Sequence, residues 1–280
     1  MLTQKDYLQK RDELITLGYT VVPNILSQPF LDELRTWSKR VFDQVPVDPK
    51  YRYQGSDIHV STQRRWDKLD NPERTIQRFP DPIIDRLVDW EPAWEACRNL
   101  GLEHEKPSDT MIILSKPAFG PPLYWHQDFM NWNHPEAAAP WPTKVFLSYY
   151  LTDTNRENGC LRAIPGSHQK RLPLHDILPP AHGPDIQAIE DLNHPVFQDH
   201  PDAVDLPVHA GDLVLADARL LHAAWPNQTD QRRTLLLQWH SVFSFPNPPS
   251  WWAGDIPDVI RNADLSITYE PTRTPGIHLT

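Results

Sequence analysis

Cysteine and glycine are scarce in this 280-residue chain, and long apolar runs are missing. The two cysteines, Cys97 and Cys160, are too few for a disulfide framework, and the chain starts without a secretory signal, so both are expected to be reduced thiols. The ten glycines are about half the usual share of ~7%, which disfavours flexible linkers. No run of about 20 uncharged apolar residues occurs, which argues against a membrane span. We therefore expect a cytoplasmic protein with no membrane partner.

Positive charge is also in short supply. The 27 Lys and Arg residues are outnumbered by 37 Asp and Glu residues, which gives a formal net charge of -10 with histidine neutral. No broad basic face is available to bind a phosphate backbone, so no nucleic-acid partner is expected. The sequence does not indicate an oligomeric state.

Proline, tryptophan and histidine are abundant instead, with 30, 11 and 13 residues. Proline is roughly twice its usual ~5%, which favours short elements joined by stiff turns over long helical bundles. Filling a core accounts for most of the tryptophans, but several are expected to line a groove or pocket. The histidines have to be sorted by their neighbours in the sequence.

The first part of the chain, residues 1–109, is predicted to be mainly helical. Capping residues and the helical spacing of apolar residues predict three helices, one from Thr3 to Gly18, one from Ser27, and one from Asp81 through Trp94. A short strand, Tyr19–Val22, is predicted between the first two helices. Residues 43–80 carry many charges and little periodicity, and we interpret them as a solvated loop.

From residue 110 the sequence changes to short apolar runs separated by Pro, Gly and Asn. The runs predict strands at Thr110–Ser115, Val145–Leu151, Cys160–Ile164, Leu213–Ala216 and Thr234–Val242. We expect one domain over 1–280, in which antiparallel strands of 110–245 close into a barrel or sandwich. A Pro-rich insertion, 169–205, interrupts this core, and a Pro-rich tail, 246–280, follows it. The histidines of the insertion are expected to be exposed: His175, His182, His194 and His200.

The segment His126-Gln127-Asp128 carries the first chemical signal. In an extended segment, residues two apart project to the same side, so His126 and Asp128 can offer a nitrogen and an oxygen to one metal ion. A third ligand must come from elsewhere in the chain. Two histidines and one carboxylate form a donor set suited to non-haem Fe(II), with positions left open for co-substrate and oxygen.

A second signal follows about a hundred residues later. Gly211-Asp212 forms a turn into a strand, His222 lies just beyond that strand, and Arg233 opens the next one. An arginine at this distance from His222 can point into the same cavity and bind a carboxylate through two hydrogen bonds. Arg232 is the adjacent alternative, but alternation along a strand sends it to the opposite face.

Taken in order, these motifs resemble the phytanoyl-CoA dioxygenase family of Fe(II)- and 2-oxoglutarate-dependent oxygenases, which includes the ectoine hydroxylases. The similar segments are Gly18–Val22, Trp125-His126-Gln127-Asp128, Asn158-Gly159-Cys160-Leu161, Pro165-Gly166-Ser167-His168, Gly211-Asp212, His222 and Arg233. The resemblance implies a mainly β fold with flanking helices and a double-stranded β-helix core, the jelly roll or cupin-like architecture.

The resemblance also implies roles for single residues. His126, Asp128 and His222 match the iron ligands, and Arg233 matches the arginine that pairs with the distal carboxylate of 2-oxoglutarate. Ala224 stands where several members carry a serine. This difference does not affect the expected class of enzyme, but the substrate of a family member cannot be transferred to this chain. Because Asp128 keeps the carboxylate that related halogenases lack, halogenation is disfavoured.

The expected activity is hydroxylation, or another oxidation, of an unactivated C–H bond in a small or medium-sized metabolite. Fe(II), 2-oxoglutarate and O₂ would be required, and succinate and CO₂ released. Alternatives are a metal-dependent hydrolase and a catalytically silent binding module on the same scaffold. The strand Lys144–Leu151 is expected to alternate, with Lys144, Phe146, Ser148 and Tyr150 on one face. This more polar face is expected to look into the site, which makes Phe146, Ser148 and Tyr150 candidate substrate residues. Trp132, in the loop after the metal motif, is a candidate wall of the substrate pocket.

Overall fold

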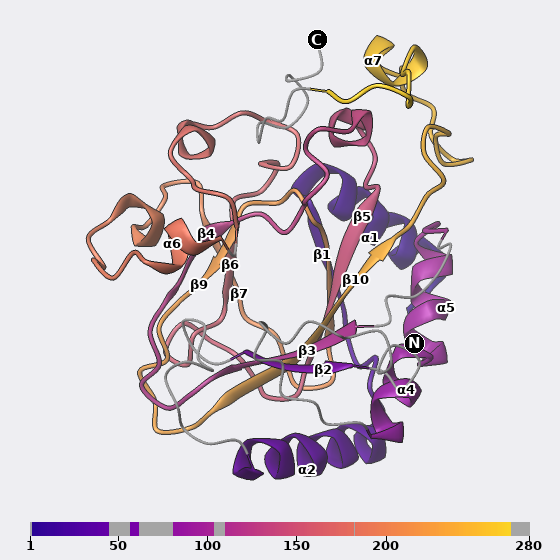
Figure 1. Ribbon diagram of the computed structural model, residues 1–280. Helices are drawn as coiled ribbons and strands as arrows, with labels where there is room; N and C mark the ends of the chain where they lie inside the picture. Colours follow the sequence, from indigo (N-terminus) through magenta and orange to yellow (C-terminus); the bar gives the residue numbers. More distant parts are fainter. Residues whose placement is uncertain (1, 45–56, 62–80, 104–109, 182, 270–280) are drawn as a thin grey trace.

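The computed structural model describes residues 2–44, 57–61, 81–103, 110–181 and 183–269, and within them two antiparallel sheets face each other (Figure 1). The larger sheet has the strand order β1-β8-β5-β10-β3-β2 and the smaller one β4-β9-β6-β7. The strands are β1 (Tyr19–Val22), β2 (Asp57–Ser61), β3 (Thr110–Lys116), β4 (Leu123–His126), β5 (Lys144–Tyr150), β6 (Leu161–Ala163), β7 (Val204–Leu206), β8 (Leu213–Asp217), β9 (His222–Ala224) and β10 (Arg233–Ser241). This is the jelly roll that the sequence predicts, and the predicted strands are each within two residues of an observed one.

Alternation along the strands divides the core into two layers. On β5, Phe146 and Tyr150 belong to the cluster between the two sheets, whereas Val145, Leu147 and Tyr149 belong to the cluster on the outer face of the larger sheet. The polar face of this strand therefore looks between the sheets, as predicted. The space between the sheets is where side chains of β4, β5, β9 and β10 can meet.

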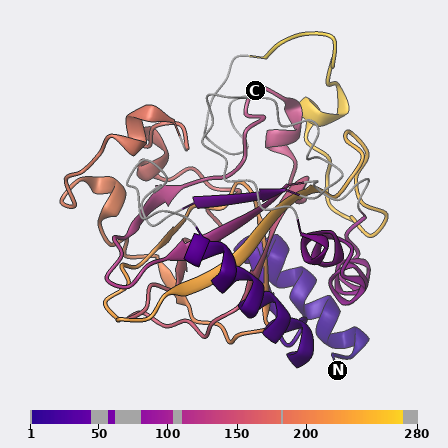
Figure 2. The same ribbon diagram turned by 60° about the horizontal axis from the view of Figure 1, so that its bottom comes forward.

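Helices cover the outer face of the larger sheet (Figures 1 and 2). They are α1 (Gln4–Leu17), α2 (Gln28–Gln44), α4 (Pro82–Val88) and α5 (Glu91–Asn99). Thr3 caps α1 through a capping box with Asp6, and Gly18 ends it in the left-handed conformation at φ 88°, as predicted. The second helix places Phe30, Leu34 and other apolar residues on its buried face.

The predicted single helix after residue 81 is wrong, since the structure contains two helices with a break at Asp89 and Trp90. Pro92 explains the break. Its nitrogen cannot donate to the carbonyl of Val88, and its ring would collide with that carbonyl if the first helix continued. The carbonyl of Val88 accepts instead from the indole Nε1 of Trp94, at 2.8 Å.

The solvated loop predicted for 43–80 is also wrong for the described part of that segment. Residues 57–61 form the edge strand β2, which pairs with β3. The other residues of that segment lie outside the described residues, except for the end of α2 at 43–44.

The insertion covers the outer face of the smaller sheet. Its short elements are η3 (Pro173–Asp176), α6 (Pro184–Gln187) and η4 (Pro195–Phe197), and β7 begins inside its predicted range. Leu174, Leu178 and Val196 pack there with Tyr124 and Trp125. His175 is buried, contrary to prediction, because η3 folds it inward.

The first part of the tail packs against the core on the helical side. Trp251, Trp252 and Ile260 contact the larger cluster, and the tail contains the short helix α7 (Asp258–Arg261). A further short helix, η2 (Pro135–Ala138), follows the metal motif. Among the described helices, none has the length and apolar character needed to cross a bilayer.

Candidate metal centre

His126, Asp128 and His222 meet between the two sheets, with their ligand atoms all within 4.8 Å of one another. His126 ends β4, His222 begins β9, and the two residues lie directly opposite each other in the pairing of these strands. His126 Nε2 lies 3.5 Å from Asp128 Oδ1, and His222 Nε2 lies 3.8 Å from Asp128 Oδ2. All three side chains are buried. The structure thus brings together the three predicted metal ligands.

The backbone fixes the orientation of both imidazole rings. His126 Nδ1 donates to the carbonyl of Tyr124 at 2.9 Å, and His222 Nδ1 donates to the carbonyl of Leu220 at 3.0 Å. Because a carbonyl oxygen can only accept, each Nδ1 carries the proton and each Nε2 presents a lone pair to the centre. This is the tautomer that a histidine ligand needs.

Asp128 is held by a tryptophan of the facing sheet. Trp239 Nε1 donates to Asp128 Oδ2 at 2.9 Å. This bond holds one carboxylate oxygen and orients the other, Oδ1, toward His126. Two imidazole nitrogens and a carboxylate in a buried space are a donor set that fits Fe(II). Trp239 has no signal in the local sequence, because it reaches Asp128 only through the arrangement of the sheets.

Arg233 is also buried, beside a second buried cation that the sequence does not predict. Lys116 pairs directly with Arg233 across β3 and β10, and both side chains are almost fully buried. Lys116 Nζ donates to the carbonyl of Pro121 at 2.5 Å. Burial, and then the nearby Arg233, hold the pKa of Lys116 well below its ordinary value, and burial lowers the pKa of Arg233.

This pair of cations lacks an anion among the described residues. Arg233 Nε has no hydrogen-bond partner there, nor has the hydroxyl of Tyr150, whose pKa burial raises to about 12. Two adjacent buried cations are costly unless a negative group joins them, so the pocket suits a carboxylate. Arg232 points the other way, to Ser115 Oγ at 2.9 Å and to the ring of Phe42, as alternation along the strand predicts.

Gly159, in the motif Asn158-Gly159-Cys160, makes room for this lysine. A Cβ atom at Gly159 would lie 2.7 Å from Lys116 Cδ and 2.7 Å from the carbonyl of Trp225, and the residue has φ 86°. A larger side chain would strain the turn and displace the stem of the lysine.

The predicted substrate residues lie at different depths. The ring of Phe146 is 5.0 Å from that of His222, so it borders the metal centre. Ser148 and Tyr150 are buried on the same face of β5, toward Arg233. Trp132 packs on Phe129 in a small cluster beside the metal motif, with ring centroids 5.0 Å apart.

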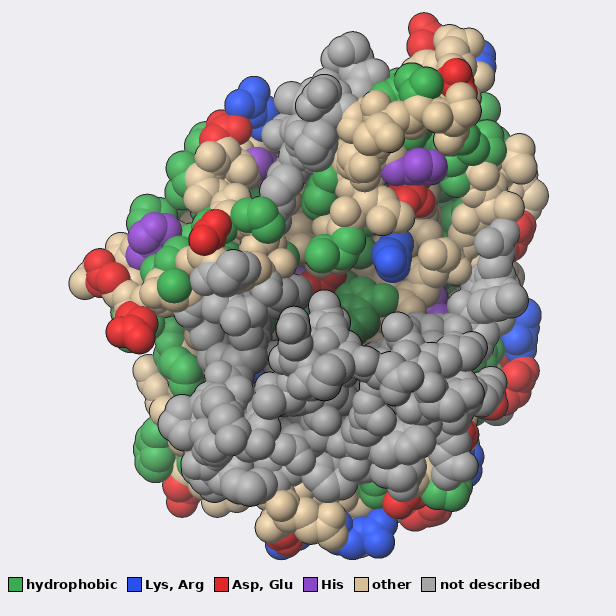
Figure 3. All heavy atoms as spheres, viewed as in Figure 1, with side chains coloured by type: hydrophobic (Ala, Val, Ile, Leu, Met, Phe, Trp, Pro, Cys, Tyr) green, Lys and Arg blue, Asp and Glu red, His purple; other side chains and the backbone are tan. Residues whose placement is uncertain are grey.

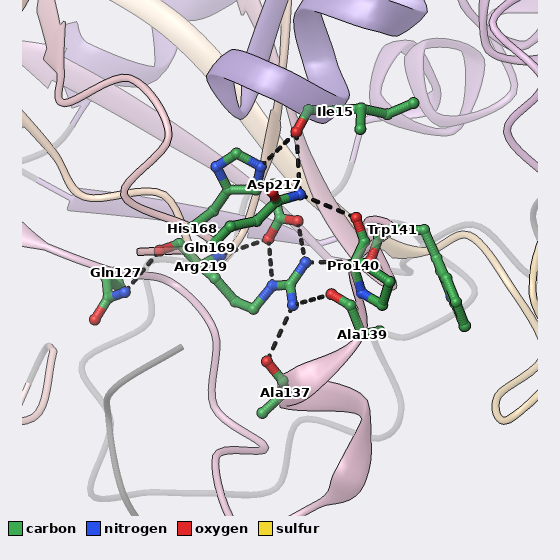
Figure 4. Close-up of polar contacts among 10 residues, drawn as sticks. All are labelled: Ile15, Gln127, Ala137, Ala139, Pro140, Trp141, His168, Gln169, Asp217 and Arg219. Carbon is green, nitrogen blue, oxygen red and sulfur yellow. Dashed lines mark hydrogen bonds and ion pairs between the residues drawn. The ribbon is translucent and has the colours of Figure 1, made fainter. Parts of the chain in front are cut away.

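A buried ion pair ties the metal motif to the turn before His222 (Figure 4). The guanidinium of Arg219 bonds both oxygens of Asp217, at 3.0 and 2.6 Å, and each residue is 1% exposed. It also donates to the carbonyls of Ala137, Ala139 and Trp141 at 2.7–3.1 Å. This network, the Asp217–Arg219 clamp, therefore holds η2 and the residues after it.

The same turn holds the residues next to the metal ligands. Gln127 Nε2 donates to the carbonyl of Arg219 at 2.6 Å and contacts His175 of the insertion at 3.3 Å. The backbone N–H of Phe129 donates to the carbonyl of Ala218 at 2.8 Å. The clamp thus links the segment that carries His126 and Asp128 to the one that carries His222.

Replacing Arg219 by methionine is expected to destabilise the protein by about 3–5 kcal/mol, because Asp217 would remain buried without its cation. The free energy of unfolding in urea, followed by circular dichroism, measures the effect. Arg86→Met is the matched control, since the Arg86–Glu33 pair is about half exposed and should matter little. Equal, small losses in both variants would contradict the role of the clamp.

The chain is similar to a known protein family and to several curated proteins. A model of the family described as phytanoyl-CoA dioxygenase (PhyH) matches residues 16–235. The ectoine dioxygenase of Bordetella parapertussis is 29% identical over 202 residues, covering 64% of this chain and 60% of that protein. A probable alpha-ketoglutarate-dependent hypophosphite dioxygenase of Stutzerimonas stutzeri is 25% identical over 236 residues, covering 84% and 76%. The chain thus spans about 60% of the length of the first of these curated relatives.

The fold is shared with solved structures. SnoN from nogalamycin biosynthesis, a non-heme alpha ketoglutarate dependent epimerase, superposes with a TM-score of 0.57 at 18% identity, covering 90% of this chain and 91% of that one. At this level of identity the likeness concerns the architecture of the chain.

Proposed function

The chain belongs to the phytanoyl-CoA dioxygenase family, and from this premise we propose that it is an Fe(II)- and 2-oxoglutarate-dependent dioxygenase. It hydroxylates, or otherwise oxidises, an unactivated C–H bond of a small or medium-sized metabolite. His126, Asp128 and His222 hold the iron. When bound, the iron would supply the activation of O₂ that couples conversion of 2-oxoglutarate to succinate and CO₂ with oxidation of the substrate.

The protein itself binds and orients the reactants. Arg233 and Lys116 bind the distal carboxylate of 2-oxoglutarate, Arg233 through its planar fork and Lys116 as a point charge. Tyr150 OH and Ser148 lie on the same face and are proposed to contact the co-substrate. Phe146 and Trp132 border the metal centre and are proposed to form the apolar wall that excludes water and faces the substrate.

The observation that carries this proposal is the pairing of two sites between the same two sheets. One is a buried donor set of two histidines and an aspartate, and the other is a buried pair of cations, Lys116 and Arg233. A hydrolytic metal centre has no use for the second site. A dicarboxylic acid that binds metal at one end and needs a cation at the other uses both.

The test is release of succinate and CO₂ from 2-oxoglutarate by the purified protein under air, with and without Fe(II). Release that requires both Fe(II) and O₂ is expected, including a slow rate without added substrate. Zn²⁺-supported hydrolysis independent of 2-oxoglutarate would favour the hydrolase. Binding of ligands with no turnover under any condition would favour the silent module.

We further propose that the substrate is a free metabolite and not an acyl-CoA. CoA carries several phosphate charges and calls for clustered Lys or Arg at the pocket mouth. In the insertion, Arg171 is engaged with Asp176, which leaves Lys170 as its remaining basic residue. The basic cluster between Arg64 and Arg78 lies outside the described residues. Competition between acyl-CoA thioesters and the matching free acids or amines measures the preference, and salt-sensitive use of the thioesters alone would overturn this proposal.

The affinity for 2-oxoglutarate is expected to fall as pH rises through the pKa of Lys116 in the free protein. That pKa is depressed from 10.5, first by burial and then by Arg233, so the ammonium form is disfavoured until an anion is present. A bound carboxylate favours the ammonium form and raises the pKa. Binding therefore takes up a proton wherever Lys116 is neutral in the free protein, and affinity is highest below that pKa.

Calorimetric titration of the Mn(II)-loaded protein with 2-oxoglutarate, in buffers of different ionisation enthalpy, measures this uptake across neutral and alkaline pH. Lys116→Met should bind 2-oxoglutarate more weakly and should lose the uptake. The same proton uptake in both proteins would assign it to another group.

A further inference from the structure

Lys144 occupies an inward position at the start of β5, the strand that borders the metal centre. Alternation along β5 puts it on the same face as Phe146, whose ring lies 5.0 Å from His222. The side chain is only partly exposed, and no hydrogen bond or ion pair joins its ammonium group to another described residue. Its stem can pack on apolar surface while the ammonium group stays available to a ligand.

The strand pairing of β5 places Lys144 two residues from a pair of aromatic residues at the metal centre. In the register of β5 and β10, Lys144 pairs with Ser241 and Phe146 pairs with Trp239, the residue that bonds Asp128. On the other side, the carbonyl of Lys144 accepts from the N–H of Ala218, at 2.9 Å.

That side leads to the predicted pocket wall. Ala218 belongs to the cluster that contains Phe129 and Trp132. In Figure 3, hydrophobic, basic and acidic side chains gather around a depression near the middle of the face where β5 lies. Through its backbone, Lys144 therefore adjoins the cluster beside the metal motif.

The position along the strands separates Lys144 from the co-substrate site. Arg233 begins β10, and Tyr150 ends the antiparallel β5 beside it, whereas Trp239 and Phe146 lie near the metal ligands. Lys144 and Ser241 come next in the same direction. The order along the barrel is thus co-substrate cations, metal centre, Lys144.

Other cations near the centre are already engaged. Arg219 bonds Asp217, and Arg232 lies on the outer face with Ser115. Lys116 lies beside Arg233 at the co-substrate end. Among the described cations of this region, Lys144 is left to meet a negative group that arrives from the side opposite 2-oxoglutarate.

We propose that Lys144 binds an oxyanion of the substrate, a carboxylate or a phosphate, while the body of the substrate packs on Phe146 and Trp239. This assignment rests on the proposed function and adds the substrate class to it. Residues two apart along a strand are separated by roughly 6.5–7 Å, so the anionic group is expected several bonds away from the carbon that reacts. The chain is acidic overall, with a net charge of -10, and an anionic substrate therefore needs such a local cation.

Binding of small aromatic probes tests this assignment without turnover. The protein is loaded with Mn(II) and saturated with 2-oxoglutarate under argon, which fills the Arg233 and Lys116 site, and is titrated with benzoate, phenylphosphonate and benzamide. The acids are expected to bind at least about tenfold more tightly than the neutral amide, as a charge-assisted hydrogen bond would give. The ratio of benzoate to phenylphosphonate affinity distinguishes carboxylate from phosphate recognition.

The variants sharpen the test. Lys144→Met should remove the preference for acids, and Lys144→Glu should reject benzoate and bind benzylamine instead. Lys170→Met, an exposed lysine of the insertion, is the matched control and should bind benzoate like the wild type. Melting temperature and Mn(II) affinity report whether each variant is folded, and Lys144→Gln replaces any variant that is not.

Equal binding of benzoate and benzamide, no binding of either acid, or unchanged benzoate affinity in a folded Lys144 variant would overturn the assignment. Failure of the proposed function has a different signature. It would appear as the absence of Fe(II)-dependent succinate release by the wild type, whatever the anion titrations give.

Discussion

Replacing any one of His126, Asp128 and His222 by alanine is expected to reduce Fe(II)-dependent succinate release to the level seen without protein, while the fold is retained. The three side chains supply all the protein ligands of the proposed centre, and two remaining ligands no longer define one face of an octahedron. None of the three belongs to a hydrophobic core cluster, so their removal leaves the packing of the sheets in place. Succinate release, bound iron and the circular dichroism spectrum measure activity, metal binding and fold separately.

His209→Ala is the control for this series. His209 is a histidine whose side chain is 88% exposed, and its replacement should change neither iron content nor turnover. Near-normal activity with Fe(II) in two of the three ligand variants would show that the metal lies elsewhere. If all three variants lose iron and unfold, the variant Trp239→Phe tests the metal site instead. It removes the hydrogen bond to Asp128 but keeps an aromatic ring. Loss of an outer partner of this kind should weaken metal affinity about 10- to 100-fold in a folded protein.

The metal ligands were accessible to sequence reasoning for a local reason. His126 and Asp128 are two residues apart in an extended segment, and the spacing alone places both on one side. His222 needed the resemblance to a family, because its place opposite His126 depends on the pairing of β4 with β9. The two short strands that carry the ligands, of four and three residues, have little periodicity of their own.

The role of Lys116 could not be predicted from the sequence. It was included in no predicted strand, since the predicted run stopped at Ser115, and its partner Arg233 is far away in sequence. Only the register of β3 against β10 puts the two cations side by side. Trp239 is a similar case, because its bond to Asp128 crosses from one sheet to the other.

The differences between the predicted and the observed fold also have specific causes. The helical spacing of Leu87, Trp90 and Trp94 predicts one continuous helix. Pro92 divides it into two, because a proline in that position cannot continue a helix. The burial of His175 follows from tertiary packing of the insertion on the smaller sheet and from its contact with Gln127. Neither contact has a signature in the local sequence.

Arg233→Ala is expected to raise the apparent KM for 2-oxoglutarate about 10- to 150-fold, the equivalent of roughly 1.5–3 kcal/mol for a charge-assisted, two-bond contact with a carboxylate. Arg233 is 6% exposed, and its Nε has no hydrogen-bond partner among the described residues. This nitrogen is therefore available to the carboxylate of 2-oxoglutarate, and alanine cannot replace the contact. Steady-state succinate release at varied 2-oxoglutarate concentration measures the change.

Arg232→Ala distinguishes this role from a general effect of charge. Arg232 precedes Arg233 but lies on the opposite face, against Ser115 and Phe42, and its replacement should leave the KM for 2-oxoglutarate unchanged. Arg233→Lys should fall between wild type and Arg233→Ala, because an ammonium group restores the charge but not the planar fork that bonds both carboxylate oxygens. An unchanged KM in Arg233→Ala, with a defect in Arg232→Ala instead, would reverse the assignment of the two faces of β10. In that case Lys116, which pairs with Arg233 across the sheet, could not be part of the carboxylate site either.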